Sequence, residues 1–332
     1  MTAKTTLSVV ALTAALAAPA FAQTRTNIQI AGSSTVLPFA SIVAEEFGQA
    51  FPEFETPVVS SGGTGGGLRQ FCEGVGPNTI DIADASRPIK ASEIEACHAN
   101  GVNDIREIRI GYDGIVFASQ LSGPEFALTP ELVYRAIGAN QPEGTALPTN
   151  WSDIDPSLPN QRIMMAIPAS NHGTREVFEQ RVIEAGCHAV LGDDAEGDTC
   201  LSLRQDNVVE IAGDYTETLA RLNSDADTIG VFGLSFYENN TDKLQVATMG
   251  GVTPSVETVA KGEYPVSRPL YFYVKKAHIG VIPGLKEYAE FFVSDRMAGA
   301  DGPLAEYGLV PAPEAELKKV QEAVKAETTL GM

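Results

Sequence analysis

The sequence predicts an α/β fold, and three observations support that prediction. Short apolar runs alternate with segments of helical periodicity from about residue 27 to residue 325. Three of the apolar runs lead through a turn rich in Gly, Ser and Thr directly into a helical segment. The chain has 332 residues, of which 44% are hydrophobic. That is enough for one large domain or two medium ones with their own cores.

Strands are predicted where short runs are rich in Val, Ile and other residues that fit a half-buried pleated surface. These runs are residues 27–31, 58–60, 80–83, 115–118, 162–167, 229–232 and 270–274. Most of them are separated by a segment of helical length, so sequential strands are expected to be joined by helices.

Helices are predicted from apolar spacing and from end signals. In residues 36–50 the apolar side chains recur every three or four positions and share one face, and Pro38 is tolerated in the first turn. A capping box beginning at Ser92 starts another helix, and Thr129 followed by Pro130 starts a third. The remaining predicted helices are residues 68–72, a segment containing Val177, Phe178 and Val182, and residues 285–292 and 314–325. Residues 138–160 and 192–198 read as loops.

The first 22 residues read as a signal peptide rather than as part of the fold. Lys4 precedes an apolar run over residues 7–18, and Ala20-Phe21-Ala22 fits a cleavage site after Ala22. The run is too short to span a bilayer, which needs about 20 residues. No Cys follows the site, so no lipid anchor is expected. No later stretch predicts a membrane-spanning helix. An exported protein of the periplasm is therefore predicted.

The charge and the cysteines limit the possible partners. With 23 Lys+Arg against 43 Asp+Glu, the formal net charge is -20. Nucleic acids and anionic membrane surfaces would repel such a chain. Export permits disulfides, and proximity favours Cys72 with Cys97 and Cys187 with Cys200 among three possible pairings. The Cys and His spacing fits no zinc module, so neither a metal nor a cofactor is expected.

The turns that follow the strands carry the functional signal. Residues 32–35, 62–67 and 170–174 each offer backbone N–H groups at a predicted helix N-terminus, together with hydroxyl groups. Such turns hold oxyanions. Ser86 and Arg87 follow a further strand, and Arg175 lies in the first turn of its helix. Each feature alone has a plain structural explanation: Ser34 as a helix cap, an arginine as an ion pair, His172 as a loop residue. Together they lie at the carboxyl ends of strands, where open α/β sheets bind ligands.

Known nucleotide and hydrolase motifs are missing from the sequence. No Gly is followed by Lys, and neither G-x-G-x-x-G nor G-x-S-x-G nor H-E-x-x-H occurs. The turns therefore favour a small free anion over a nucleotide.

Several stretches resemble the periplasmic phosphate-binding proteins of ABC transporters. They are AGSSTVLPF at 31–39, GTGGG at 63–67, DIADASR at 81–87, NWSDI at 150–154, HGTRE at 172–176, LYFYV at 270–274 and GLVP at 308–311. The resemblance runs through nearly the whole mature chain in order. It implies a periplasmic-binding-protein fold: two α/β lobes, each a mostly parallel sheet flanked by helices, joined by two crossing hinge strands. One lobe would hold residues 24–111 and 265–332, and the other residues 112–264.

The resemblance also implies a ligand and a set of contacts. Inorganic phosphate would be captured in the cleft between the lobes and delivered to the membrane permease of an ABC transporter, by a monomer that is not an enzyme. The implied phosphate-binding residues are Ser34, Thr35, Thr64, Ser86, Arg87, His172, Gly173, Thr174 and Arg175. Phosphate keeps a proton that sulfate lacks, so a carboxylate acceptor would select it. Asp84 is the first candidate for that acceptor and Asp113 the second.

The sequence departs from the family pattern at three places, and other readings stay open. His172 replaces the Ser of the usual Ser-Gly-Thr, Pro168 stands where some members have a ligand Arg, and Ser86 stands where some have the acceptor Asp. Arg87 or Arg175 could replace the missing Arg. The first alternative is a binding protein for molybdate, tungstate or sulfate. Two others are an exported phosphatase, with Ser34 or His172 reactive, and a surface adhesion or signalling protein that keeps the fold.

Overall fold

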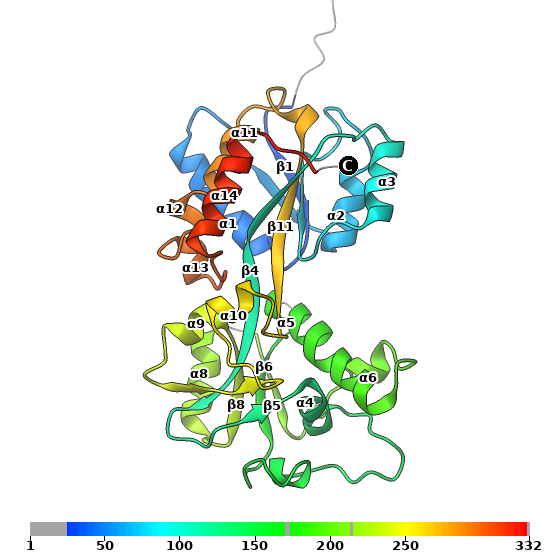
Figure 1. Cartoon of the computed structure of the whole chain (residues 1–332), viewed down its shortest axis with the longest axis vertical. Coiled ribbons are helices and arrows are strands. Elements are labelled where there is room, and N and C mark those ends of the chain that lie inside the picture. The colour runs from blue at the N-terminus through cyan, green and yellow to red at the C-terminus, as the bar shows by residue number, and fades with distance from the viewer. Residues whose placement is uncertain (1–24, 170–172, 213–214, 331–332) are drawn as a thin grey trace, which may run out of the picture.

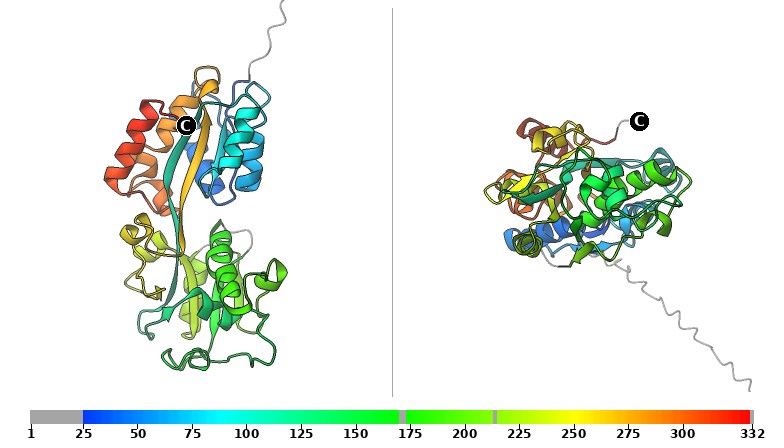
Figure 2. Two further views of the ribbon diagram at one scale, coloured as in Figure 1. Left: turned by 45° about the vertical axis from the view of Figure 1, so that its right-hand side comes forward. Right: turned by 90° about the horizontal axis from the view of Figure 1, so that it is seen from below.

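The computed structural model describes residues 25–169, 173–212 and 215–330 and shows two lobes, one above the other in Figure 1. Lobe 1 contains the first three strands, and lobe 2 contains strands β6 to β8 (Figure 1). Figure 2 shows the same arrangement from another side, with two long strands running from one lobe into the other.

Helices and strands alternate along lobe 1. Its first part comprises β1 (Gln29–Gly32), α1 (Leu37–Ala50), β2 (Val58–Ser61), α2 (Gly63–Phe71), β3 (Ile82–Ala85) and α3 (Ala91–Ala99). The end of the chain adds η3 (Lys276–His278), α11 (Leu285–Phe292), α12 (Asp295–Ala298), α13 (Pro303–Glu306) and α14 (Glu314–Lys325).

Lobe 2 contains the middle of the chain. Its strands are β5 (Ala127–Leu128), β6 (Met164–Pro168), β7 (Val208–Ile211), β8 (Thr228–Gly233), β9 (Leu244–Val246) and β10 (Thr248–Met249). Its helices are α4 (Pro130–Ile137), η1 (Trp151–Asp153), α5 (Gly173–Phe178), η2 (Glu179–Glu184), α6 (Ala185–Leu191), α7 (Asp198–Leu201), α8 (Tyr215–Ser224), α9 (Leu234–Glu238) and α10 (Val256–Ala260).

Two strands connect the lobes: β4 (Ile105–Gln120) and β11 (Ser267–Lys275) (Figures 1 and 2). The strand order is β2-β1-β3-β11-β4-β8-β6-β7, with β9 paired to β4. β4 pairs with β11 over residues 105–114 and with β8 and β9 over residues 115–120, so it belongs to the sheets of both lobes. β1, β2 and β3 are parallel, and so are β6, β7 and β8. In each lobe the loops after the parallel strands therefore meet at one edge of the sheet.

Gly111 lets the long strand β4 pass close to the end of the chain. Its φ of +143° is accessible to glycine, and a Cβ there would lie 2.7 Å from the carbonyl oxygen of Val310. The register of β4 with β11 shifts next to Gly111: Leu270 is opposite Gly111, and Tyr271 is opposite Arg109. The shift is a β-bulge that sets which side chains face each other on the two connecting strands.

A large buried apolar cluster extends through both lobes. A smaller cluster lies between α2, α3 and the sheet of lobe 1, and it includes Cys72 and Cys97. The structure joins Cys72 to Cys97 and Cys187 to Cys200, which confirms the pairing predicted from proximity. No helix among the described segments has the length and apolar character needed to cross a lipid bilayer.

Most predicted elements are confirmed, several of them with shifted ends. The predicted helices at 285–292 and 314–325 match α11 and α14, and Thr129 caps α4 by accepting from the backbone N–H of Leu132. The predicted strand at 115–118 is part of a 16-residue strand. The predicted capping box at Ser92 is wrong: α3 begins at Ala91, and Glu93 accepts a hydrogen bond from the backbone N–H of Lys90 at 2.8 Å.

The sequence predicted a turn over residues 62–67, but most of this glycine run is helical. α2 begins at Gly63, five residues before the predicted start at 68. Glycine is a poor helix former, so packing must stabilise this turn of helix. A Cβ on Gly67 would lie 2.4 Å from the Cα of Gly32, which shows that α2 packs directly on the backbone of β1.

Candidate functional site

The loops after β1, β2 and β3 lie side by side because these strands are parallel and in register. The backbone N–H of Ser33 donates to the carbonyl oxygen of Asp84 at 2.9 Å, and that of Gly62 donates to the carbonyl oxygen of Gly32 at 2.9 Å. These bonds hold the first three strand-to-helix connections against one another. The convergence that the sequence predicted for lobe 1 is present.

The connection between β1 and α1 is shaped by a buried serine. Ser33 is 1% exposed, and its Oγ accepts from the backbone N–H of Thr35 at 3.2 Å. This short-range bond bends the chain before the helix. It leaves Ser34 exposed and Thr35 buried, and both line the cavity described next.

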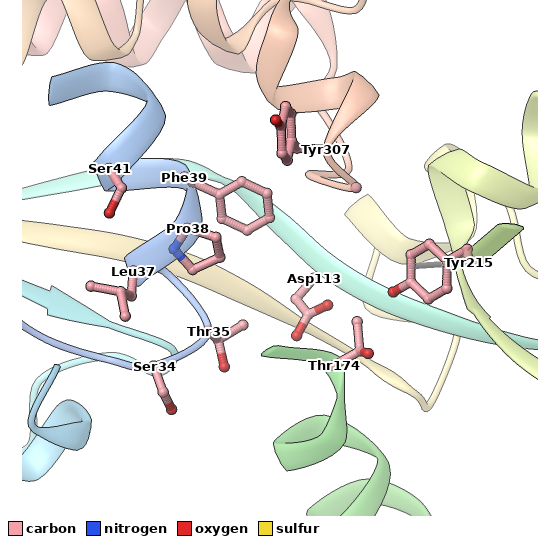
Figure 3. A pocket seen from close by; sticks show the side chains of 11 residues that line it. Ser34, Thr35, Leu37, Pro38, Phe39, Ser41, Asp113, Thr174, Tyr215 and Tyr307 are labelled. Carbon is pink, nitrogen blue, oxygen red and sulfur yellow. The ribbon is translucent and has the colours of Figure 1, made fainter. Parts of the chain in front are cut away.

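A cavity of about 420 Å³ lies where the two lobes and β4 meet. Figure 3 shows Thr35, Asp113 and Thr174 around one part of it, with Phe39 and Tyr307 on the lobe 1 side. It is lined by Ser34, Thr35, Leu37, Pro38, Phe39, Ser41, Asp113, Thr174, Tyr215, Tyr307 and Gly308. Its wall thus combines hydroxyl groups from both lobes with one buried carboxyl group and several apolar side chains.

Lobe 2 contributes hydroxyl groups to the cavity from two helices. Thr174 lies in the first turn of α5, and Tyr215 is the first residue of α8 (Figure 3). The Tyr215 hydroxyl is hydrogen-bonded to Thr174, and burial raises the pKa of Tyr215 above its ordinary value. At neutral pH both side chains are therefore neutral hydroxyls, and one of the two donates its single proton to the other.

Arg268 and Asp113 face each other on the two strands that join the lobes. They are register partners in the pairing of β11 with β4, and their side chains are 4% and 6% exposed. Arg268 Nε lies 3.5 Å from Asp113 Oδ2, which makes an ion pair without a close hydrogen bond. Arg268 Nη2 also donates to Thr35 Oγ1 at 2.8 Å. The guanidinium therefore lies beside the cavity hydroxyl of lobe 1.

Asp113 has an unusual environment for a carboxyl group. Burial raises its pKa, the neighbouring Glu176 raises it further, and Arg268 opposes this. Its Oδ2 has no hydrogen-bond partner among the described residues. The oxygen is paired with Arg268 but makes no hydrogen bond, so it can still accept one from a ligand in the cavity.

Glu176 connects the two lobes at the same point. It lies in the first turn of α5, and its Oε2 accepts from Thr35 Oγ1 at 2.9 Å. The same oxygen is 3.3 Å from Arg268 Nη2. Lobe 1, lobe 2 and a connecting strand are therefore joined through one carboxylate.

The two arginines predicted from the sequence lie in ion pairs of their own. Arg87 donates to both carboxylate oxygens of Glu93, at 2.9 and 2.8 Å. Arg175 donates to Glu179 at 2.7 Å, to Glu210 at 3.0 Å and to the carbonyl oxygen of Pro168 at 2.8 Å. Neither lines the cavity.

The other predicted site residues divide into three groups. Thr64 and Ser86 are buried and contact each other, since Thr64 Oγ1 accepts from the Ser86 backbone N–H at 3.1 Å, but neither lines the cavity. Gly173 begins α5, and His172 lies outside the described residues. Asp84 is 1% exposed, and neither carboxyl oxygen has a hydrogen-bond partner within the part of the chain that the structure describes; burial raises the pKa of Asp84 well above its ordinary value.

Arg268, Glu176 and Tyr215 were not among the predicted site residues. The available signal for Arg268 was a charged residue at the start of an apolar strand, which indicates a buried cation with a partner. Its partners Asp113 and Thr35 lie 155 and 233 residues away, so the sequence alone could not identify them. Among the described residues, no group of three or more His, Cys, Asp or Glu side chains is arranged to hold a metal ion.

Comparison with known proteins gives a consistent result. The family model described as a PBP superfamily domain matches residues 17–296. Protein SphX of Synechococcus elongatus is 32% identical over 288 residues, covering 85% of this chain and 76% of its own length. Phosphate-binding protein PstS of Staphylococcus aureus (strain USA300) is 28% identical over 302 residues, covering 89% of this chain and 81% of its own.

A solved structure agrees with the fold. The crystal structure of a possible phosphate binding protein from Planctomyces limnophilus DSM 3776 is similar with a TM-score of 0.70 at 24% identity. The similarity covers 91% of this chain and 99% of that one. The chain therefore belongs to the PBP superfamily, and the periplasmic-binding-protein fold that the resemblance implied is confirmed. The PstS relative is named as a phosphate-binding protein and the family model is that of the PBP superfamily, so this chain is not an enzyme, as expected.

Proposed function

We propose that this protein captures inorganic phosphate outside the cytoplasm and delivers it to the permease of an ABC transporter. The observation that carries the proposal is the meeting of Thr35, Thr174 and Arg268 beside one cavity, from lobe 1, lobe 2 and a connecting strand. Hydroxyls and a guanidinium are the donors that a tetrahedral oxyanion needs. The PstS proteins of the staphylococci, named as phosphate-binding, support this choice of anion.

The proposed contacts combine sequence and structure. Ser34, Thr35 and Thr174 line the cavity. Arg268 contacts Thr35 and would replace the ligand Arg that some members of the family have at the position of Pro168. Thr64, Ser86, His172 and Gly173 remain predicted ligands. Arg87 and Arg175 pair with carboxylates that do not line the cavity, whereas Arg268 contacts the cavity-lining residues Thr35 and Asp113, so we assign Arg87 and Arg175 a structural role. Their ion pairs fix the segments that follow β3 and β6.

Asp113 is the better candidate for the acceptor of the phosphate proton. It lines the cavity, and its Oδ2 pairs with Arg268 at 3.5 Å but makes no hydrogen bond among the described residues, whereas Asp84 does not line the cavity. A ligand without a proton would meet that oxygen with another lone pair, which is unfavourable in a buried site. Sulfate is such a ligand at neutral pH.

The proton-acceptor assignment is tested by two matched substitutions. Asp113→Asn is expected to bring the phosphate and sulfate affinities closer together, because the neutral amide can turn an N–H donor toward sulfate, whereas the carboxylate offers acceptors only. Asp84→Asn is expected to leave the ratio of the two affinities unchanged. Titration calorimetry with each anion measures that ratio. The reverse pattern would assign the role to Asp84.

We further propose that lobe 1 consists of residues 24–111 and 265–332 and lobe 2 of residues 112–264. β4 and β11 pass from one lobe to the other near these limits, and this supports a hinge there. Phosphate would close the lobes by bridging Thr35 and Thr174, and the permease would recognise the closed form. Residues 1–22 would direct export and be removed after Ala22, leaving a monomer in the periplasm.

A melting-temperature screen of phosphate-stripped mature protein tests the proposal directly. Phosphate at a hundredfold excess over its dissociation constant is expected to stabilise the folded state by about 2.7 kcal/mol. Sulfate, molybdate and tungstate are run beside it, because another oxyanion is the main alternative. The largest shift with one of these anions would reassign the ligand, and no shift with any anion would exclude oxyanion binding.

A further inference from the structure

The Glu176 carboxylate already occupies donors that an incoming anion needs. Its Oε2 accepts the hydroxyl proton of Thr35 at 2.9 Å and lies 3.3 Å from Arg268 Nη2. Its Oε1 accepts from Gln180 Nε2 at 3.2 Å, one turn along the same helical run. The side chain is 35% exposed, so it can move away without opening the core.

The number of protons on Thr35 makes this contact exclusive. A hydroxyl has one proton to donate. In this structure Thr35 Oγ1 accepts from Arg268 Nη2 at 2.8 Å and directs its own proton to Glu176. A phosphate oxygen can accept that proton only after the bond to Glu176 is broken.

We propose that Glu176 is an affinity-determining positioning residue, an internal carboxylate that holds Thr35 and Arg268 in the unliganded cleft and must be displaced by phosphate. The proposal rests on the proposed function for the identity of the ligand. The contact itself does not depend on that identity. It joins the loop after β1, strand β11 and helix α5, so its loss removes one link between the lobes, and a phosphate that bridges Thr35 and Thr174 would replace that link.

This arrangement has a consequence for selectivity. Acetate would only replace the Glu176 carboxylate with another carboxylate at the same donors, so its net binding free energy would be small. Phosphate has four oxygens and can also contact donors that Glu176 does not reach, including Ser34 and Thr174 at the cavity wall. Glu176 therefore lowers the affinity for anions that make few contacts, whereas phosphate makes enough contacts to displace it.

The test compares four forms of phosphate-stripped mature protein: the unsubstituted chain, Glu176→Gln, Thr35→Ala and the double variant. Titration calorimetry with inorganic phosphate is expected to show about 3- to 10-fold tighter binding for Glu176→Gln, because the neutral amide oxygen accepts from Thr35 and Arg268 more weakly than the carboxylate does and is easier to displace. In the Thr35→Ala background the same substitution is expected to increase phosphate affinity much less, because the Thr35 hydroxyl proton for which Glu176 and phosphate compete is absent. Glu184→Gln, about two turns further along the same helical run, removes the same charge and is the matched control.

Two results from the titrations would overturn the proposal. An equal gain in the Thr35→Ala background, or an equal gain from Glu184→Gln, would show that only the removed charge matters. Weaker phosphate binding by Glu176→Gln would show that Glu176 contacts the ligand instead of competing with it.

Hydrogen exchange of the unliganded proteins gives a readout that needs no ligand. Glu176→Gln is expected to speed amide exchange both in the loop that contains Thr35 and in α5, and Glu184→Gln is not. Unchanged exchange in Glu176→Gln would overturn the proposal. If the unsubstituted chain binds no phosphate, the proposed function fails, while this comparison still decides whether Glu176 holds Thr35.

Discussion

Arg268 is the residue on which the chemistry of the cleft depends. It contacts Asp113 on the neighbouring strand, Thr35 of lobe 1 and Glu176 of lobe 2. A planar guanidinium can hold several oxygen acceptors at once, while an ammonium group is a single point charge on a flexible stem. The side chain is the counter-ion of a buried carboxyl group, and we expect it to serve as a ligand donor as well.

Substitution of Arg268 separates these two roles. Arg268→Lys keeps the charge beside Asp113 but loses the branched contacts, so phosphate affinity is expected to fall about 10- to 100-fold with the fold retained. Arg268→Gln also leaves Asp113 without a counter-ion, so its melting temperature is expected to fall as well. Calorimetry and thermal unfolding measure the two effects. Unchanged phosphate affinity in Arg268→Lys would remove Arg268 from the ligand set.

Asp84 gives a prediction about stability and pH. Burial raises its pKa well above the ordinary value, whereas in the unfolded chain the carboxyl titrates near about 4. Above that pH the folded protein retains a proton that the unfolded chain has lost, so this group lowers stability as pH rises. The slope is about 1.4 kcal/mol per pH unit until the folded-state pKa is reached.

The variant Asp84→Asn lacks this titration. Its stability relative to the unsubstituted protein is expected to increase from about pH 4 upward, and to level off above the folded-state pKa. Urea unfolding at several pH values measures the difference. A difference that stays constant with pH would mean that Asp84 is charged in the folded protein and has a partner.

At the scale of elements, the contact between α2 and β1 positions the second turn that the sequence predicts to bind an anion. A Cβ on Gly67 would lie 2.4 Å from the Cα of Gly32 and 2.6 Å from the carbonyl oxygen of Ala31. Backbone atoms cannot yield as a flexible side chain can. The helix that begins with the predicted ligand loop therefore depends on glycine at this position.

Gly67→Ala is expected to destabilise the protein by about 1–3 kcal/mol, as overpacked positions do, and to weaken phosphate binding by moving α2 away from β1. Gly66→Ala is the matched control. A Cβ on Gly66 meets only the flexible Arg69 side chain, at 3.8 Å, so better helix propensity should leave stability equal or higher. Urea unfolding and calorimetry test both variants. Equal stability of the two variants would contradict the packing argument.

The same elements show what the sequence could and could not predict. Helices α11 and α14 have clear amphipathic periods, and their predicted ends match the structure. The early start of α2 could not be predicted, because its glycines are stabilised by packing on a distant strand. The hydroxyls of Ser34, Thr35 and Thr174 were found because turns after strands are visible locally. Arg268 and Glu176 were not, because their contacts cross 92 to 233 residues of sequence.

At the scale of the whole molecule, the net charge acts differently at long and short range. The formal charge is -20, and an approaching phosphate experiences repulsion from the surface as a whole. Inside the cleft, Arg268 and the hydroxyl groups act at contact distance in surroundings of low dielectric constant. Long-range repulsion should therefore slow association without determining the affinity of the closed state.

Salt tests this separation. The screening length falls from about 30 Å at 0.01 M to about 10 Å at 0.1 M ionic strength. Added salt should therefore raise the association rate of phosphate, about twofold or more, and change the dissociation rate little. Stopped-flow tyrosine fluorescence can follow binding, because Tyr215 and Tyr307 line the cavity. Sodium chloride and sodium acetate should act equally at equal ionic strength if the effect is screening rather than competition. An association rate that falls with salt would mean that a positive field at the cleft mouth outweighs the charge of the whole molecule.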